Sequence, residues 1–208
     1  NSGADDDLLK LKVTTQGERF LVSGSGQNAD YANPKAIKSE GDMTVNSGII
    51  TVSCTQSTEG GEGLESKSTM YIKGGRITGS TYDDCINAAK HIEVSGGTHS
   101  LTARGNDGMD SNGTLTISGG MVISKGAGGP EEGFDCDNNT FKVLGGIIVG
   151  TGGNTSNPTA NVSTQNSLKL SIASNQNICI RDASGRVILM YALPPLQGGG
   201  PGPGGNSK

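Results

Sequence analysis

Acidic and amide side chains recur in the middle of the chain at fixed positions, and their types suit metal binding. Each stands two or three places before, or one place after, a large apolar residue. The set is Asp83, Asp84, Asn87, Asp107, Asp110, Glu131, Glu132 and Asp135. Hard oxygen donors in excess, with no sulfur or imidazole recurring beside them, are the ligands that Ca²⁺ prefers. The sequence therefore predicts a calcium site held by these eight residues, with Asp110 at its centre.

The apolar residues that set this register belong to a repeat that runs five times. Its anchors are Ile37, Leu64, Ile86, Met109 and Phe134. Eleven residues after each of the first four anchors comes a glycine, and after the fifth anchor the glycine comes twelve residues on. A repeat with a period in this range is typical of a solenoid, in which each unit stacks on its neighbours.

Within each unit the residues before the glycines alternate between apolar and polar, which indicates a half-buried strand. Met43 and Val45 of the first unit are predicted to point inward, and Thr44 between them outward. The outward residue of the later units is Tyr71, Glu93, Thr116 or Lys142. Three short strands per unit, with glycine corners, predict an all-β fold, a right-handed parallel β-helix. A helical fold lacks support because no window keeps an apolar face at helical spacing, and a sandwich does not repeat at this period.

Stacking places equivalent residues of neighbouring units about 4.8 Å apart. Carboxylates that close repel one another at low dielectric unless something neutralises them. A single acidic pair is ordinary solvated surface, but the same register in four consecutive units favours a metal. The first unit departs from the pattern, with Lys35 and Lys38 at the acidic positions, so the strip is expected to begin at Glu62. No segment matches the EF-hand loop or the glycine-rich nonapeptide of calcium β-rolls.

The composition bears on the class of protein. Glycine numbers 35 and aromatic residues are 3%, yet the glycines recur in register with aliphatic residues, which argues against disorder. The net charge of −4 gives no electrostatic support for nucleic-acid binding. No apolar run of membrane-spanning length is present. The four cysteines show no metal-binding spacing and no evident partners, so four free thiols are predicted.

Four segments make up the expected organisation of the chain. Residues 1–35 are expected to form N-terminal cap strands or an incomplete first turn, and residues 36–150 the β-helix. Residues 151–193 are expected to be a C-terminal β cap with strands at 168–172, 178–180 and 187–191 that covers the last unit. Residues 194–208 are a Gly/Pro-rich tail or linker.

The repeated segments resemble those of a known family. They read Asp83-Asp84-Cys85-Ile86-Asn87-Ala88, Asn106-Asp107-Gly108-Met109-Asp110-Ser111 and Glu131-Glu132-Gly133-Phe134-Asp135. These motifs, and the Leu-Thr-Ile-Ser-Gly-Gly stretch that ends at Gly120, are similar to repeats of bacterial carbohydrate-binding β-helix domains of the clostridial cellulose- and polygalacturonate-binding type. The resemblance covers residues 36–150. It implies a pectate-lyase-like superhelix, calcium in the acidic strip and a secreted or surface-anchored bacterial protein. Cys85 in place of glycine, and the glutamates at 131 and 132, depart from the motif.

The function expected from these observations is calcium-dependent binding of an acidic plant or bacterial polysaccharide, such as polygalacturonate, with cellulose as a further ligand. Tyr71, Arg104 and Lys125 are the candidate carbohydrate contacts, and no catalytic residue is assigned. A calcium-dependent polysaccharide lyase is the alternative from another class, with Arg104 or Lys125 as the base. A structural adhesin that calcium stiffens is the third reading. We expect secretion or surface attachment, the signal segment not being present in this chain.

Overall fold

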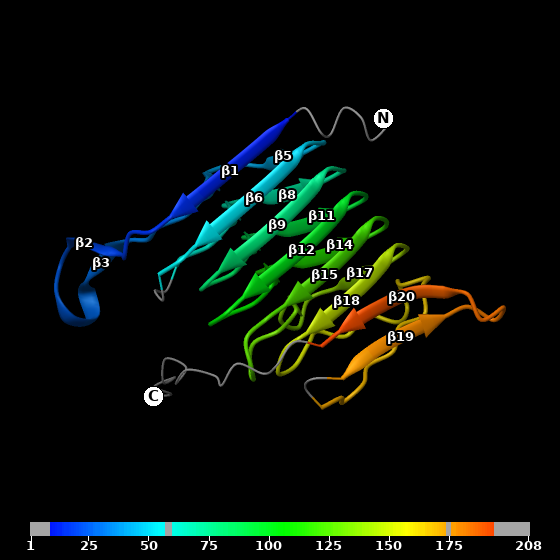
Figure 1. The fold of residues 1–208 in the computed structure, drawn as a ribbon. Coiled ribbons are helices and arrows are strands. Elements are labelled where there is room, and N and C mark those ends of the chain that lie inside the picture. The colour runs from blue at the N-terminus through cyan, green and yellow to red at the C-terminus, as the bar shows by residue number, and fades with distance from the viewer. Residues whose placement is uncertain (1–8, 57–59, 174–175, 194–208) are drawn as a thin grey trace.

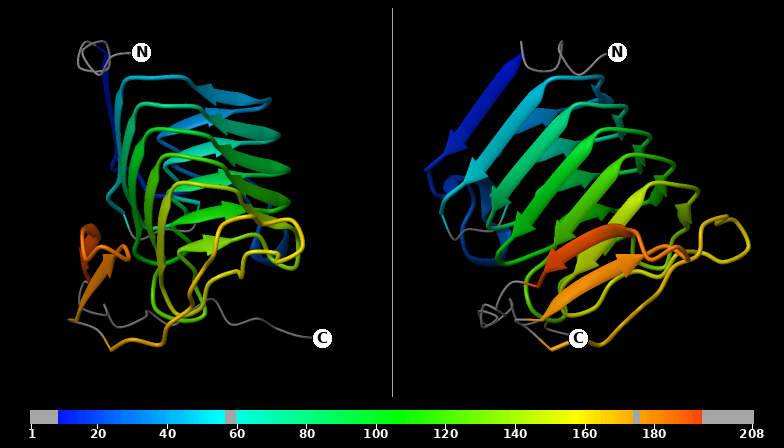
Figure 2. Two further views of the ribbon diagram at one scale, coloured as in Figure 1. Left: turned by 90° about the vertical axis from the view of Figure 1, so that its right-hand side faces the viewer. Right: turned by 45° about the vertical axis from the view of Figure 1, so that its right-hand side comes forward.

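A computed structural model describes residues 9–56, 60–173 and 176–193, and shows an all-β chain in which parallel strands stack into a β-solenoid. Each rung of the solenoid contains three strands, and the described residues form five such rungs (Figures 1 and 2). The predicted β-helix is therefore confirmed. The 3-10 turn η1 (Gly26–Asn28) is the only helical element in the described part of the chain. No helix found there is long and apolar enough to cross a membrane.

Three parallel sheets form the walls of the solenoid, and we call them sheets I, II and III. Sheet I has six strands: β1 (Lys10–Thr15), β6 (Ile49–Cys54), β9 (Arg76–Thr81), β12 (Thr98–Ala103), β15 (Met121–Lys125) and β18 (Ile147–Thr151). Sheet II has five: β4 (Ile37–Ser39), β7 (Leu64–Ser66), β10 (Ile86–Ala88), β13 (Met109–Ser111) and β16 (Phe134–Asp135). Sheet III also has five: β5 (Met43–Val45), β8 (Thr69–Ile72), β11 (His91–Val94), β14 (Thr114–Ile117) and β17 (Phe141–Val143).

Equivalent residues of successive rungs pair directly, so each core position forms a column. Ile86 of β10 lies between Leu64 and Met109, and all three side chains are buried. In sheet III, Val45 is 7% exposed and Met43 packs against the core, which confirms the predicted strand register. The small residues two places after the anchors line the interior as a narrow ladder, and Ala88, Ser111 and Cys136 in it are buried. All four cysteines are free thiols, as predicted.

Paired glycines at the corners between sheets III and I let the rungs stack closely. A Cβ on the first glycine of a pair would collide with the rung before it: at Gly119 it would lie 2.5 Å from the carbonyl oxygen of Ser95. Four of the five corners have such a pair, and in the first corner Ser47 precedes a single glycine, Gly48. The last glycine has a positive φ in all five corners, for example 93° at Gly97 and 83° at Gly120. Only glycine adopts this conformation without a steric cost. The recurrence of glycine in the sequence thus has a local physical cause in both positions.

The two ends of the solenoid differ. At the N-terminal end, β1 pairs in parallel with β6 and extends sheet I by one strand beyond the other two sheets. Strands β2 (Phe20–Ser23) and β3 (Asp30–Ala32) form an antiparallel pair that projects from this end (Figure 1). At the C-terminal end, β19 (Asn177–Arg181) and β20 (Val187–Ala192) form an antiparallel hairpin. This hairpin lies in front of the β18 end of sheet I (Figures 1 and 2).

Of the three strands predicted in the C-terminal segment 151–193, those at 178–180 and 187–191 are confirmed as β19 and β20, and the one at 168–172 is wrong. Residues 168–172 form no strand. The segment before them lies along the free edges of β16 and β17: Thr159 N–H donates to the Phe141 carbonyl at 2.7 Å, and Thr164 N–H to the Val143 carbonyl at 3.0 Å. Hydroxyl oxygens of Thr159 and Ser163 in turn accept the N–H groups of Phe141 and Val143, each at 3.1 Å. The expected tail, 194–208, lies outside the described residues.

The corner geometry predicts that Gly120→Ala destabilises the protein. The Cβ would lie 2.8 Å from backbone atoms of Gly96 and Gly97, and the residue would keep a positive φ. We expect a loss of about 2 kcal/mol or more, which lowers the melting temperature by roughly 4–8 °C. Gly41→Ala is the control, since nothing lies within 4 Å of its Cβ position. Equal melting temperatures of the two variants would contradict this account of the corners.

Candidate functional site

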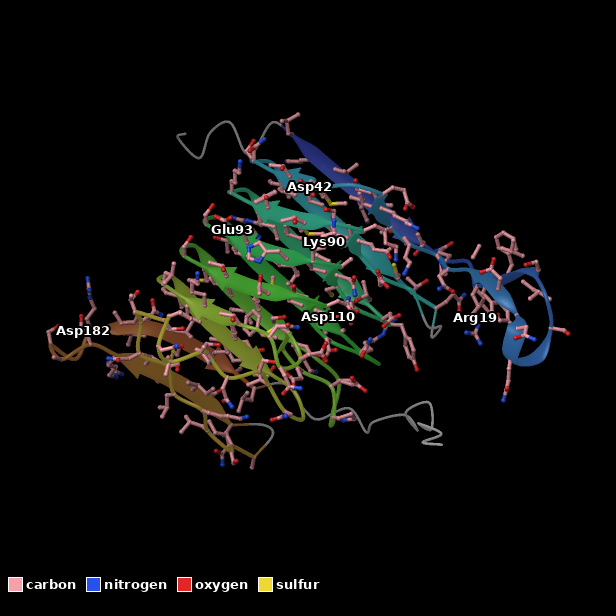
Figure 3. All side chains as sticks on the ribbon, turned by 180° about the vertical axis from the view of Figure 1, so that it is seen from behind. Arg19, Asp42, Lys90, Glu93, Asp110 and Asp182 are labelled. Atoms are coloured by element: carbon pink, nitrogen blue, oxygen red, sulfur yellow. The ribbon has the colours of Figure 1, made fainter. Side chains whose placement is uncertain are left out.

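The predicted acidic residues gather along one corner of the solenoid, where sheet I passes into sheet II, and along the outer face of sheet II. We call this region the acidic strip. Asp84 and Asp107 occupy the same corner position in successive rungs and are 2% and 6% exposed. Asn87, Asp110 and Asp135 pair with one another in register on β10, β13 and β16 and are partly exposed. Asp110 is visible on the back of the solenoid in Figure 3.

Backbone N–H groups hold the corner carboxylates in place. The Asp107 N–H donates to Asp84 Oδ1 at 3.0 Å, and the Glu132 N–H donates to Asp107 Oδ1 in the same way one rung further on. Each buried acid therefore accepts a hydrogen bond from the equivalent residue of the next rung. These bonds fix the side chains but do not neutralise their charge.

Asn87 lies at the centre of the strip. Its Nδ2 donates to Asp84 Oδ2 at 2.9 Å and to Asp110 Oδ2 at 3.0 Å, so one amide links carboxylates from two rungs. The remaining ligand candidates have other partners. Asp83 accepts hydrogen bonds from Asn106 and Gly60, and Asp135 accepts them from the Asp137 N–H and the Ser156 hydroxyl. Oε2 of Glu132 is buried without a hydrogen-bond partner within the described residues.

The electrostatics of the strip are unfavourable in the absence of a cation. Burial raises the pKa of Asp107 to about 8, and repulsion from Asp135 and Asp110 adds to the shift. Burial also raises the pKa values of Asp84 and Asp110, whose charges repel each other and those of further carboxylates. The pKa of Glu131 and that of Glu132 are raised for the same reason, burial first and neighbouring acids second. A bound cation would remove this cost.

Lysines supply the missing positive charge at the N-terminal end of the strip. Lys35 Nζ lies 2.5 Å from Glu62 Oε1 and 3.7 Å from Glu65 Oε2, and Lys67 also pairs with Glu65. Glu62 and Glu65 are nearly fully buried. Burial still raises the pKa of Glu62 to about 7, and Lys35 opposes that shift. The lysines that break the acidic pattern in the first unit are thus counter-ions of the second, and the strip without counter-ions begins at Asp83 and Asp84.

The residues fit a hard cation in their chemistry. Every predicted ligand offers oxygen, and turning the Asn87 amide over would present its Oδ1 to the same place that Nδ2 now occupies. Within the described residues, however, no three His, Cys, Asp or Glu side chains converge in the geometry of a metal site. In this structure the carboxylates are linked through the Asn87 amide and through backbone N–H groups. Calcium at this position remains a prediction.

The three predicted carbohydrate contacts do not share one surface. Tyr71 lies on the outer face of sheet III, with Lys73 Nζ 5.7 Å from its ring centroid. Arg104 follows β12 of sheet I and Lys125 ends β15 of the same sheet. The Arg104 guanidinium donates to the carbonyls of Cys54 and Thr55 at 3.0 and 3.2 Å, which is a structural role. A guanidinium held as a donor in this way is poorly placed to act as the base of a lyase.

Tyr82 is an aromatic residue that the sequence analysis did not single out. It directly precedes Asp83 at the end of β9 and is partly exposed. Its ring fills the space beside Gly105, where a Cβ would come within 2.7 Å of the ring. The position of Tyr82 directly before the predicted ligand Asp83 could have indicated a role in the site. The repeat does not indicate Tyr82, because the other rungs have no aromatic residue at the equivalent position.

The fold and the strip together define a β-solenoid with regular polar faces, a scaffold suited to binding extended ligands. A family model described as "Carbohydrate-binding domain-containing protein" matches residues 4–108, half of the chain. The chain belongs to this family, and carbohydrate binding is the general function that the family supports. A search of curated proteins and a search of solved structures gave no significant match.

The raised pKa values predict how stability depends on pH when metal is removed. A carboxyl whose pKa is raised on folding contributes fully to stability below its ordinary value near 4 and loses that contribution as the pH rises through the raised value. For Asp107 that window extends from about 4 to about 8. In the presence of a chelator we therefore expect the melting temperature to fall between pH 5 and pH 8.5, and Asp107→Asn to flatten the curve. A melting temperature that stays level or rises over this range in chelator would contradict it.

The lysine pairs predict that Lys35→Met strongly destabilises the protein. Its removal leaves Glu62 buried without its cation and Glu65 with one lysine fewer, which costs about 3 kcal/mol or more. The melting temperature should fall by roughly 6–12 °C. Lys73→Met removes an exposed lysine that lies only over a tyrosine ring, and it serves as the control. A loss no larger than that of the control would show that the pair does not stabilise the rungs.

Proposed function

We propose that the protein is a non-catalytic module that binds an acidic polysaccharide, such as polygalacturonate, in a calcium-dependent manner. The observation that carries the proposal is the contrast along the strip. Lysines neutralise Glu62 and Glu65, whereas Asp84, Asp107 and Asp110 have no ion-pair partner among the described residues and have raised pKa values. A divalent cation bound by Asp84, Asp107 and Asp110 would supply the positive charge that lysines supply to Glu62 and Glu65.

Burial assigns different roles to the two rows of the strip. A cation next to Asp84 and Asp107 would lie inside the corner, where it stabilises the stack. The row of Asn87, Asp110 and Asp135 faces outward on sheet II, so a cation held there could also contact a carboxylate of the ligand. A polymer with one carboxylate per sugar offers such contacts repeatedly, and the rungs repeat in the same direction.

The family supports this function over a lyase, for which the fixed Arg104 guanidinium is an unsuitable base. Cellulose remains a possible neutral ligand of the same module. We further propose that the protein acts outside a bacterial cell, secreted or attached to the surface, because its ligand would be found there. The reading as an adhesin that calcium only stiffens differs in one respect: calcium would then alter stability but not glycan binding.

Removal of one outward-facing predicted calcium ligand tests whether the acidic strip binds calcium. We expect Asp110→Ala to weaken calcium binding by on the order of ten- to a hundred-fold, as measured by titration calorimetry, while circular dichroism stays unchanged. Glu93→Ala is the matched control, since Glu93 is an outward carboxylate on the neighbouring sheet III (Figure 3). An unchanged melting curve of the wild-type protein between excess calcium and excess chelator would show that the strip is only a solvated acidic face.

Binding to the polymer separates the two roles of calcium. We expect polygalacturonate to retard the wild-type protein in affinity electrophoresis with calcium, and much less with chelator below the temperature at which the metal-free protein melts. If calcium raises the melting temperature but leaves retardation unchanged, calcium is structural only. If no acidic polysaccharide retards the protein in either buffer, the proposed ligand class is wrong.

A further inference from the structure

The outer face of sheet I is the largest regular surface of the solenoid, and it faces the viewer in Figure 1. Alternate residues of its strands point outward, because their neighbours fill the core columns. We call this surface the sheet I face. From the strand register its middle rows contain the following residues: Lys12, Thr14, Thr51, Ser53, Thr78, Ser80, Ser100, Thr102, Ile123 and Lys125. The same rows end on β18 with Val149, which is 8% exposed, and Thr151, whose hydroxyl is buried, on the side where the β19–β20 hairpin lies in front of the sheet. The row at the start of the strands contains Lys10, Ile49, Arg76, Thr98, Met121 and Ile147.

The charges on this face are all positive. Its ionisable residues are Lys10, Lys12, Arg76 and Lys125, and none of its outward positions is an Asp or Glu. The chain as a whole has 20 acidic and 16 basic residues. The outer faces of sheets II and III, in contrast, carry charges of both signs: Lys38, Asp110 and Asp135 on sheet II, and Glu93 and Lys142 on sheet III. An anionic polymer is therefore attracted more to the sheet I face than to the other two, and the carboxylates of sheet II repel it unless a metal intervenes.

The centre of the face is an array of hydroxyls. Thr51, Ser53, Thr78, Ser80, Ser100 and Thr102 occupy two neighbouring rows on three consecutive strands. None of these hydroxyl groups takes part in a hydrogen bond within the described residues, and Thr78 and Ser100 are exposed. The array has spacings of about 4.8 Å between strands and about 6.6 Å along them. Hydroxyls that can donate and accept suit the hydroxyl and ring oxygens of a polysaccharide.

Positive groups lie on two sides of the array, Arg76 at the start of its middle strand and Lys125 on the strand next to β12. Arg76 begins β9 and Lys125 ends β15, two strands and four residues away, which corresponds to on the order of 16 Å. Within the part of the chain that the structure describes, neither side chain forms a hydrogen bond or an ion pair, so both are available to a ligand. The partly exposed ring of Tyr82 lies just past the end of β9 and adds an apolar surface for a sugar ring. A ligand that reaches both Arg76 and Lys125 must be a chain of several sugars.

We propose that the sheet I face binds a linear polyuronate directly, with its carboxylates at Arg76 and Lys125 and its hydroxyl groups on the Ser/Thr array. The inference rests on the proposed function for the ligand class, and it adds a second contact surface that needs no metal bridge. The charge of the face selects a polyuronate over a neutral glucan. Oligomers too short to span the array bind more weakly than the polymer.

Binding of polygalacturonate to variants of the full chain tests this placement, with calcium present throughout so that the acidic strip keeps its state. In Arg76→Ser/Lys125→Ser the two positive groups are lost, and in Thr78→Glu a negative charge, like that of the ligand, is placed in the array. We expect each to weaken binding by about ten-fold or more in affinity electrophoresis. Thr44→Glu is the matched control, an exposed outward threonine on β5 of sheet III, and its binding stays within about two-fold of wild type. Melting curves establish that each variant is folded.

The outcomes separate this inference from the proposed function. If the wild-type protein binds no polyuronate, both fail. If the wild type binds and both sheet I variants bind equally well while Asp110→Ala does not, the strip alone holds the ligand and the sheet I face is not a site. A loss in Thr44→Glu that matches the loss in Thr78→Glu also overturns the placement. Equal binding of a neutral glucan, or tighter binding of single-stranded nucleic acid than of polyuronate, overturns the ligand class assigned to this face.

Discussion

Parallel pairing of each rung with the next is the constraint on which the rest of this structure depends. Because equivalent residues stack about 4.8 Å apart, every side chain lies next to its counterparts in the neighbouring rungs. For apolar residues this is favourable, and the columns of Ile86, Leu64 and Met109 form a continuous core. For acids it is unfavourable, since each carboxylate meets another. The acidic strip needs a source of positive charge, and the protein uses lysines at one end of it.

The same constraint explains why much of the fold was predictable. Anchors, inward strand residues and corner glycines are each set by contacts that repeat in every rung, so the sequence shows them five times. The last glycine of each corner is required by a positive φ, and the glycine before it, present in four of the five corners, by the close carbonyl of the rung before. The positive φ and the close carbonyl each act at a single position, so each appears in the sequence as a glycine at that position. The positions of the acids followed from the same register.

The parts that sequence did not predict depend on contacts that occur once. The last rung is covered through hydroxyls of Thr159 and Ser163, which bond to strand edges without any apolar alternation to mark them. The alternation of apolar and polar residues at 168–172 is typical of a strand, but these residues pair with no neighbouring strand edge and form none. Lys35 was visible as an exception to the acidic pattern, yet its role required knowing that Glu62 and Glu65 lie within reach on the next rung. Tyr82 has no counterpart in other rungs, so the repeat gave no indication of it.

The common register of all three sheets also makes the solenoid a molecular ruler. Adding one rung lengthens the hydroxyl array, the row of outward acids and the hydrophobic core by the same step of about 4.8 Å. A relative with more repeats would therefore cover more sugars of one polymer without any change in the chemistry of a single contact. Affinity for a long chain would then rise steeply with repeat number, because each new contact forms within a complex that already exists. Repeat duplication offers evolution a way to match such a protein to the length of its ligand.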